Sequence, residues 1–187
     1  TDGTLWTWGW NQTGALGDGT TIPSGSPIQV GGGYIAVTAG DWHTAGIKSD
    51  GTLWAWGWNA KGQFGASTTE MCYDQPCSTR PLFVGSAFTA VSAGQSFTVA
   101  IKTDGTLWTW GANSSGQLGD DSVSSRSNPV QIGSGFRAVS AGYQHVIAVK
   151  TDGTLWAWGA NTSGQLGDGS TADRLVPVQI GSGYSAV

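Results

Sequence analysis

The phrase Asp-Gly-Thr-Leu-Trp-Thr/Ala-Trp-Gly occurs four times in this chain of 187 residues, beginning at Asp2, Asp50, Asp104 and Asp152. Because side chains alternate in direction along a β-strand, the two tryptophans of each copy project from the same face of one strand. Asp-Gly is typical of a hairpin turn, since Gly adopts positive φ and Asp bonds to nearby backbone amides. The phrase therefore predicts an antiparallel hairpin whose second strand carries a heavy aromatic face.

The four copies are separated by 48, 54 and 48 residues, a period typical of propellers, solenoids and other repeat arrays. Each period contains four short strand-like runs divided by turn residues and shows no helical periodicity. A single four-stranded unit exposes two faces, so the units must stack on one another. We therefore predict an all-β chain, a β-propeller of four-stranded antiparallel blades with just under four blades present.

The repeat units are expected at about residues 1–34, 35–87, 88–135 and 136–183, with a further unit beginning at 184–187. Counted by strands, the chain contains two strands of a first unit, three complete units of four strands each, and one strand of a further unit. The small residues of each unit, as at 138–142, suit the crowded strand nearest a central axis, and the Trp strand suits a wider radius. We treat the chain as a single repeat array, part of a larger propeller.

The composition narrows the possible partners. The net charge is −4, only 11% of the residues are charged, and Lys and Arg form no cluster, which disfavours nucleic acid. No apolar run approaches the roughly 20 residues of a membrane span, so we expect no membrane insertion. No pattern for a small-molecule substrate or a cofactor is evident.

The longer pattern Ala-Val-Ser-Ala-Gly-x-x-His-x-x-Ala-Val-Lys-x-Asp-Gly-x-Leu-Trp-x-Trp-Gly-x-Asn-x-x-Gly-Gln-Leu-Gly resembles the regulator-of-chromosome-condensation repeat family, including its bacterial members, over essentially the whole chain. The resemblance implies a propeller that typically has seven blades, or roughly 340 residues. It also implies two known kinds of role. Some bacterial relatives are secreted inhibitors that cap an enzyme with aromatic rim residues, and the founding eukaryotic members are exchange factors for a nuclear small GTPase.

Residues that all the copies share are explained first by the fold, whereas positions that differ among the copies are candidates for function. Two copies carry a histidine at one position, His43 and His145, and Phe97 replaces it in the copy between them. A residue that Phe can replace is expected to be packed, and no nucleophile or carboxylate recurs beside it, so we predict no catalytic residue. The side chains assigned to structure are Trp6, Trp8, Trp54, Trp56, Trp108, Trp110, Trp156, Trp158, His43 and His145.

Aromatic residues also occur in turns that differ among the copies. The turn after the small strand carries Trp42 in one copy and Tyr143 in another, and Trp10 and Trp58 follow Trp-Gly where the other copies have Ala. Exposed aromatic residues on a rigid scaffold are typical of binding hot spots. We predict that these four residues bind a protein partner, and the alternative is that Trp10 and Trp58 pack against a neighbouring blade.

The second copy alone has an insertion, residues 66–80, which contains Cys72 and Cys77. Two cysteines in a polar surface loop most simply form a disulfide, worth roughly 2 kcal/mol for so small a ring, and this favours an oxidising compartment. A free thiol pair stays open as an alternative. A zinc site would need further ligands, so we predict no metal there.

The loops after the Trp strands contain two further patterns. Acidic turns such as Asp18-Gly19 could suggest calcium, but each offers one or two carboxylates where about six to eight oxygens are needed, which favours ordinary Asx turns. Asn11, Asn113 and Asn161 each begin an Asn-x-Ser/Thr sequence. They are glycosylation acceptors in a eukaryotic secretory pathway and turn residues in a bacterium, and the sequence does not decide between the two.

Taken together, these patterns predict a non-enzymatic propeller segment, extracellular or at the cell surface. It would bind a protein partner, or further copies of itself, through its rim loops. The alternative function is a structural repeat of an extracellular or cell-surface assembly. A guanine-nucleotide exchange factor is less favoured, because the chain has no basic segment for chromatin.

Overall fold

The computed structural model describes residues 3–187, which form fifteen β-strands and no helix. Within these residues there is accordingly no helix long and apolar enough to cross a membrane. The strands are β1 (Leu5–Gly9), β2 (Ser24–Gly31), β3 (Tyr34–Ala39), β4 (His43–Lys48), β5 (Leu53–Trp58), β6 (Met71–Cys72), β7 (Gln75–Gly85), β8 (Phe88–Ala93), β9 (Phe97–Lys102), β10 (Leu107–Gly111), β11 (Arg126–Gly133), β12 (Phe136–Ala141), β13 (His145–Lys150), β14 (Leu155–Gly159) and β15 (Arg174–Gly181).

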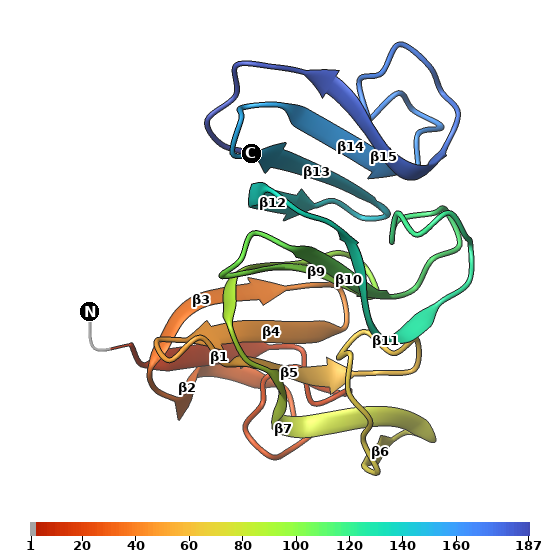
Figure 1. Ribbon diagram of the computed structural model, residues 1–187. Helices are drawn as coiled ribbons and strands as arrows, with labels where there is room; N and C mark the ends of the chain where they lie inside the picture. Colours follow the sequence, from red (N-terminus) through yellow and green to blue (C-terminus); the bar gives the residue numbers. More distant parts are fainter. Residues whose placement is uncertain (1–2) are drawn as a thin grey trace.

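The strands make four antiparallel sheets in chain order, β1-β2, β3-β4-β5-β7 with β6 added at its edge, β8 to β11, and β12 to β15. Figure 1 shows them following one another from the red and orange N-terminal strands to the blue C-terminal strands. The prediction of an all-β chain with four-stranded antiparallel blades is confirmed. The hairpins predicted at Asp50, Asp104 and Asp152 join β4 to β5, β9 to β10 and β13 to β14, whereas Asp2 lies outside the described residues.

The predicted number of strands agrees with the structure, but one strand lies elsewhere. Residues 184–187, expected to begin a further strand, have no strand pairing, although the Tyr184 N–H donates to the Gly153 carbonyl (3.0 Å). The equivalent strand of the fourth sheet, β12, is paired with β13, the strand that follows it. The additional strand is β6, which the insertion in the second copy contributes.

The small strand β8 lies beside β3 of the preceding sheet and β12 of the following sheet. The Ala93 N–H donates to Thr38 Oγ1 (3.1 Å), and the Ala141 N–H donates to Ser92 Oγ (2.9 Å), in each case across two sheets. A methyl group at Gly40 would clash with the Gly94 carbonyl of the next sheet. Small residues are therefore required where these strands meet, as expected for strands close to a common axis.

Between the sheets lies the hydrophobic core, in two clusters of buried side chains. The second tryptophan of each phrase is buried in this core in three copies, and its indole N–H donates to a carbonyl in the preceding sheet's loop. These pairs are Trp56 to Ala15 (2.9 Å), Trp110 to Gln63 (2.9 Å) and Trp158 to Gln117 (3.0 Å).

The first tryptophan of each phrase has a different environment. Trp54, Trp108 and Trp156 are partly buried and lie under a lysine, as where Lys48 Nζ is 4.6 Å from the Trp54 ring centroid. Trp6 and Trp8 of the first sheet are exposed. The second tryptophan is the more deeply buried of the two in the second, third and fourth sheets, because its indole points toward the preceding sheet's loop.

A buried asparagine closes the loop after the Trp strand in all four sheets, and in the first, third and fourth sheets it also bonds to an aspartate. Asn113 is typical, since its Nδ2 donates to Asp120 Oδ1 (2.9 Å) and its Oδ1 accepts from the Leu118 N–H (2.9 Å). Asn11 and Asn161 are bound in the same way and are equally buried. These asparagines are interior turn residues in the folded chain, and their amides are not available to carry a glycan.

The acidic residues of these loops bind protein donors. Asp120 pairs with Arg126 (2.7 Å) and Asp168 with Arg174 (2.6 Å), in addition to their bonds to Asn and Ser side chains. Hydrogen bonds from Arg174 first of all, then from Ser170 and Asn161, hold the pKa of the Asp168 carboxyl well below its usual range. These loops are thus ordinary Asx turns, the reading that the sequence favoured.

Candidate functional site

Three tryptophans from two neighbouring sheets meet on one rim of the molecule. Trp42 lies between the others, with ring centroids 5.2 Å from Trp10 at an interplanar angle of 72° and 6.3 Å from Trp58 at 65°. Such edge-to-face contacts are favourable for aromatic rings. Although the rings pack on one another, Trp10 remains 42% exposed and Trp42 39% exposed, so the group offers aromatic surface to solvent.

The backbone on both sides of Trp58 is fixed. Gly57 before it has a φ of 99°, and a methyl group there would lie 2.6 Å from the Trp42 carbonyl oxygen, so only Gly fits this turn. Asn59 after it is buried and accepts from the Phe64 N–H (2.9 Å). Trp10 stands in the same position of the first sheet, before the buried Asn11.

Trp42 is held through its backbone carbonyl. This oxygen accepts from the Trp58 N–H (2.8 Å) and from Thr13 Oγ1 (3.2 Å), which joins the turn after β3 to the end of β5 and to the loop after β1. The three indoles are therefore presented on a rigid framework built by two sheets. Rigid aromatic anchors lose little conformational entropy when a partner binds.

A tyrosine from the insertion completes this surface. Tyr73, 72% exposed, lies at the tip of the β6–β7 hairpin. Together with the three indoles it borders a cleft of about 360 Å³, which we call the aromatic cleft. The residues that line the aromatic cleft are Trp10, Gln12, Thr13, Trp42, Trp58 and Tyr73.

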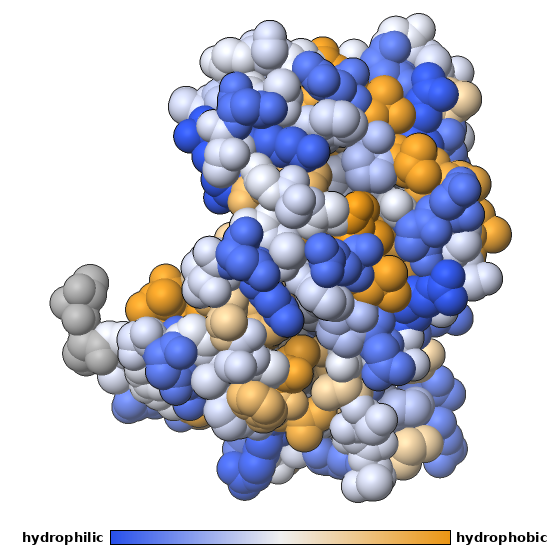
Figure 2. Space-filling model, in the orientation of Figure 1, coloured by the Kyte–Doolittle hydropathy of each residue, from blue (hydrophilic) through white to orange (hydrophobic). Residues whose placement is uncertain are grey.

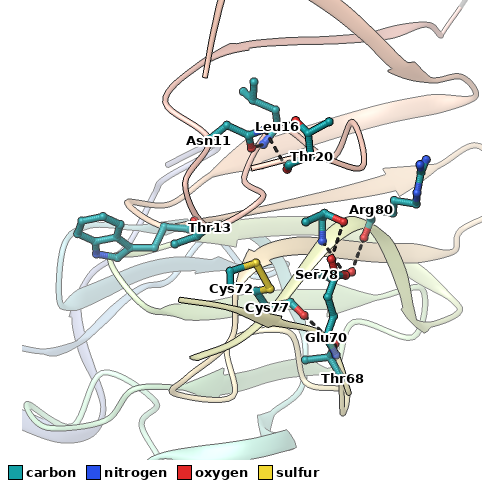
Figure 3. The surroundings of a disulfide bond; sticks show 12 residues. Asn11, Thr13, Leu16, Thr20, Thr68, Glu70, Cys72, Cys77, Ser78 and Arg80 are labelled. Carbon is teal, nitrogen blue, oxygen red and sulfur yellow. Dashed lines mark hydrogen bonds between the residues drawn. A yellow bond between two sulfur atoms is a disulfide. The ribbon is translucent and has the colours of Figure 1, made fainter. Parts of the chain in front are cut away.

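The hairpin that carries Tyr73 is cross-linked. Cys72 and Cys77 form a disulfide with a Cα–Cα distance of 5.7 Å, the pairing that the sequence favoured. The insertion lies at the surface and forms a β-hairpin at the edge of the sheet, and within it the two cysteines themselves are buried. Figure 3 shows the disulfide beside the loop of Asn11 and Thr13.

Hydrogen bonds anchor the base of the hairpin. Thr68 Oγ1 donates to the Cys77 carbonyl (2.7 Å), and the Glu70 carboxylate accepts from the backbone N–H (3.0 Å) and the hydroxyl (2.6 Å) of Thr79. Glu70, Cys72 and Cys77 lie within 4.8 Å of one another, as metal ligands would. Since the two sulfurs are bonded to each other and both carboxylate oxygens are occupied, this group is a structural anchor.

Tyr143 lies apart from the aromatic cleft. Its hydroxyl is bonded to the Gln95 side chain, and its carbonyl accepts from the Gln95 N–H (3.1 Å), where the small strands of three sheets end. The structure thus brings together three of the four predicted binding residues and separates the fourth. It adds Tyr73, which the sequence analysis did not select, although an aromatic residue within the only insertion was the signal that could have identified it.

His43 is buried at the boundary between the second and third sheets. Its Nε2 is 2.9 Å from Thr98 Oγ1, and burial lowers the pKa of its imidazole from 6.5 to about 4. His145, at the same repeat position, is half-buried, and burial also lowers its pKa. Both are placed as packing residues, and neither lies in the aromatic cleft.

Comparison with known proteins gives a consistent family. A family model described as "RCC1-like domain" matches residues 1–187. The chain is 35% identical over 132 residues to the human protein "Probable E3 ubiquitin-protein ligase HERC3", an alignment that covers 68% of this chain and 12% of that protein. It therefore spans about an eighth of this curated relative.

Solved structures match the fold over almost the whole chain. The structure of human WBSCR16 superposes with a TM-score of 0.84 at 22% identity, covering 96% of this chain and 49% of that one. The structure of Kap60 bound to yeast RCC1 (Prp20) matches with a TM-score of 0.82 at 23% identity, covering 96% of this chain and 45% of that one. At these identities the likeness concerns the fold, and this chain corresponds to about half of either structure.

Proposed function

Because this chain belongs to the RCC1-like domain family, whose repeats build β-propellers, we propose that it is a protein-binding propeller segment that uses the aromatic cleft as its docking site. The observation that carries the proposal is the meeting of three partly exposed tryptophans, from two sheets, with an exposed tyrosine. Aromatic residues held on a rigid rim dominate the binding energy of many protein interfaces.

The internal repeats support a functional origin of the cluster. In the third copy the residues that match Trp42 and Trp58 are Ser96 and Ala112. In the fourth copy they are Gln144 and Ala160. The same fold is therefore built without aromatic residues at these positions. Packing within the scaffold does not require the cluster, and exposed aromatic groups on a soluble surface carry a cost in solubility unless they serve binding.

The proposed activity is non-catalytic and needs no cofactor. The histidine of the repeat, the side chain best suited to acid-base chemistry, is committed to packing in the second sheet, where His43 bonds to Thr98. The family agrees with a binding role, since one relative of the same fold, yeast RCC1 (Prp20), has been crystallised with its protein partner Kap60.

We further propose that the protein works outside the cell or at the cell surface. Support comes from the Cys72–Cys77 disulfide, because such bonds persist mainly in oxidising compartments. Intact mass of protein isolated from its native source, alkylated with and without prior reduction, tests the proposal. Two alkylated cysteines before reduction would contradict it.

Two other functions use different features. A structural repeat of a surface assembly would rely on self-association, and size-exclusion chromatography with light scattering separates this from a discrete binder, since a stable monomer contradicts it. An exchange factor that docks on chromatin would require positive surface for phosphates, whereas this chain has a net charge of −4. The aromatic cleft favours the discrete binder.

Partner capture tests the docking site. Trp10→Ala and Trp58→Ala install the residue that the third and fourth copies carry, and Trp42→Ser installs the residue of the third copy, so the scaffold should tolerate them. We expect the triple variant to lose at least tenfold in capture of a partner from the native source, with little change in melting temperature. Tyr143→Ala, outside the cleft, is the control. Equal capture by wild type and the triple variant would overturn the proposal.

A further inference from the structure

The tryptophans of this chain fall into two groups by what their indole N–H groups bond to. Seven of the eleven donate to an acceptor within the chain, and these are Trp6, Trp54, Trp56, Trp108, Trp110, Trp156 and Trp158. Between residues 3 and 187 the other four find no acceptor. Three of these four, Trp10, Trp42 and Trp58, are the indoles of the aromatic cleft.

The aromatic cleft thus combines apolar rings with unused hydrogen-bond donors. Its lining contains no acidic or basic side chain, and the Tyr73 hydroxyl adds a further donor. The nearby backbone acceptor, the Trp42 carbonyl, is already bonded to Trp58 and Thr13. Among the side chains of the lining, only Gln12 and the two hydroxyls can accept a hydrogen bond, whereas all six carry donors.

The occupant that complements such a surface is apolar, rich in acceptors and poor in donors. Proline has these properties, because its ring is apolar and its backbone has a carbonyl but no N–H. In a polyproline II helix the carbonyls have no internal partners and are free to accept. A sugar brings many hydroxyl donors, which the lining could not satisfy, and a cationic side chain would find no carboxylate there.

The dimensions of the cluster agree with this occupant. Polyproline II has three residues per turn and a rise of about 3.1 Å per residue, so prolines at i and i+3 lie roughly 9 Å apart. Adjacent rings of the cluster have centroids 5.2 and 6.3 Å apart, distances of the same order as this repeat, and are steeply inclined to one another. Aromatic-lined grooves recognise such helices because the ligand is already extended and little entropy is lost.

We propose that the aromatic cleft binds a proline-rich segment of the partner protein in the polyproline II conformation, with the indole N–H groups of Trp10, Trp42 and Trp58 donating to its backbone carbonyls. This rests on the proposed function and specifies the chemistry of the partner. Tyr73, on its cross-linked hairpin, forms the side of the groove contributed by the insertion.

The test is titration of the ¹⁵N-labelled chain with an acetylated decaproline peptide, followed by indole ¹H–¹⁵N resonances. We expect saturable shifts confined to three of the eleven indoles, assigned through the variants Trp10→Phe, Trp42→Phe and Trp58→Phe. Each of these keeps an aromatic ring and removes the donor, so each should weaken binding by about three- to tenfold, the value of one hydrogen bond. Trp8→Phe is the matched control, since Trp8 is exposed and also lacks an acceptor but lies outside the cleft.

The outcomes separate the two proposals. Absence of saturable shifts up to millimolar decaproline, or unchanged affinity in all three cleft variants, would overturn the ligand assignment. A glycine-serine peptide of equal length should not bind, and a cello-oligosaccharide that shifted the same three indoles in place of decaproline would also overturn it. If decaproline fails while the Trp10, Trp42 and Trp58 substitutions still abolish partner capture, the docking site stands and only its ligand class falls.

Discussion

The Nε2 atom of His43 lies 2.9 Å from Oγ1 of Thr98, across the boundary between the second and third sheets. The Thr98 hydroxyl donates to the Gln63 carbonyl (2.8 Å), so it accepts from the imidazole, and the proton therefore sits on Nε2. At the next boundary the matching positions hold Phe97 and Val146, both buried in one apolar cluster. One fold thus joins its sheets by a polar pair in one place and by apolar packing in the next.

The polar pair makes stability depend on pH. Burial lowers the pKa of His43 to about 4 in the folded chain, against an unfolded value of 6.5. The folded state therefore holds a neutral imidazole while the unfolded state takes up a proton between these values. The contribution of His43 is complete above pH 6.5 and is lost as pH falls toward 4, by about 3 kcal/mol in total.

Urea unfolding at pH 7.5, 6 and 4.5 measures this loss. The double variant His43→Phe/Thr98→Val reproduces the neighbouring apolar joint and should lose much less stability over the same range. His145, whose pKa is also lowered by burial, is present in both proteins and cancels in the comparison. If the unfolding free energies of wild type and the double variant depend on pH in the same way, His43 is not the source of the pH dependence.

The two tryptophans of a phrase should differ in their cost on truncation. Trp110 is buried in the core and donates to Gln63, so Trp110→Ala should destabilise the chain by about 3–5 kcal/mol. Trp108 is partly exposed at the margin of the core, with Lys102 Nζ 4.5 Å from its ring centroid, so Trp108→Ala should cost about 1–2 kcal/mol. Chemical denaturation measures the unfolding free energy of both variants. Equal losses of unfolding free energy would contradict the different structural roles of the two tryptophans.

The buried asparagines should be essential to the loops. Asn113→Ala removes the donor to Asp120 and the acceptor of the Leu118 N–H, so we expect a loss of about 2–4 kcal/mol in unfolding free energy. Ser114→Ala is the control, because Ser114 is exposed in the same Asn-Ser-Ser sequence. Similar melting temperatures for the two variants would show that the asparagine network is dispensable.

The disulfide should stabilise both the fold and the wall of the aromatic cleft. Reduction, or Cys72→Ser/Cys77→Ser, should lower the unfolding free energy by roughly 2 kcal/mol, as expected for a ring this small. Limited proteolysis should then cut near Tyr73, which the intact hairpin protects. Resistance of the reduced chain equal to that of the oxidised chain would mean that hydrogen bonds such as Thr68 to Cys77 hold the hairpin without the bond.

The sequence by itself determined the architecture. The recurring Asp-Gly and Trp-x-Trp-Gly signals are local, since each depends on backbone conformation or on the two-residue period of a strand. They were sufficient to predict the hairpins, the four-stranded sheets and the propeller class. The pairing of Cys72 with Cys77 was also predictable, because the chain contains no other cysteine.

Only the tertiary structure decided which residues form the site. Trp10 and Trp42 are 32 positions apart and belong to different sheets, so their contact depends on how one sheet stacks on the next, which no local pattern encodes. The same stacking placed Tyr143 elsewhere, buried one tryptophan of each pair more deeply than the other, and folded the insertion back to bring Tyr73 to the cleft. Local signals fix the shape of each sheet, whereas a surface shared by two sheets exists only after they have packed together.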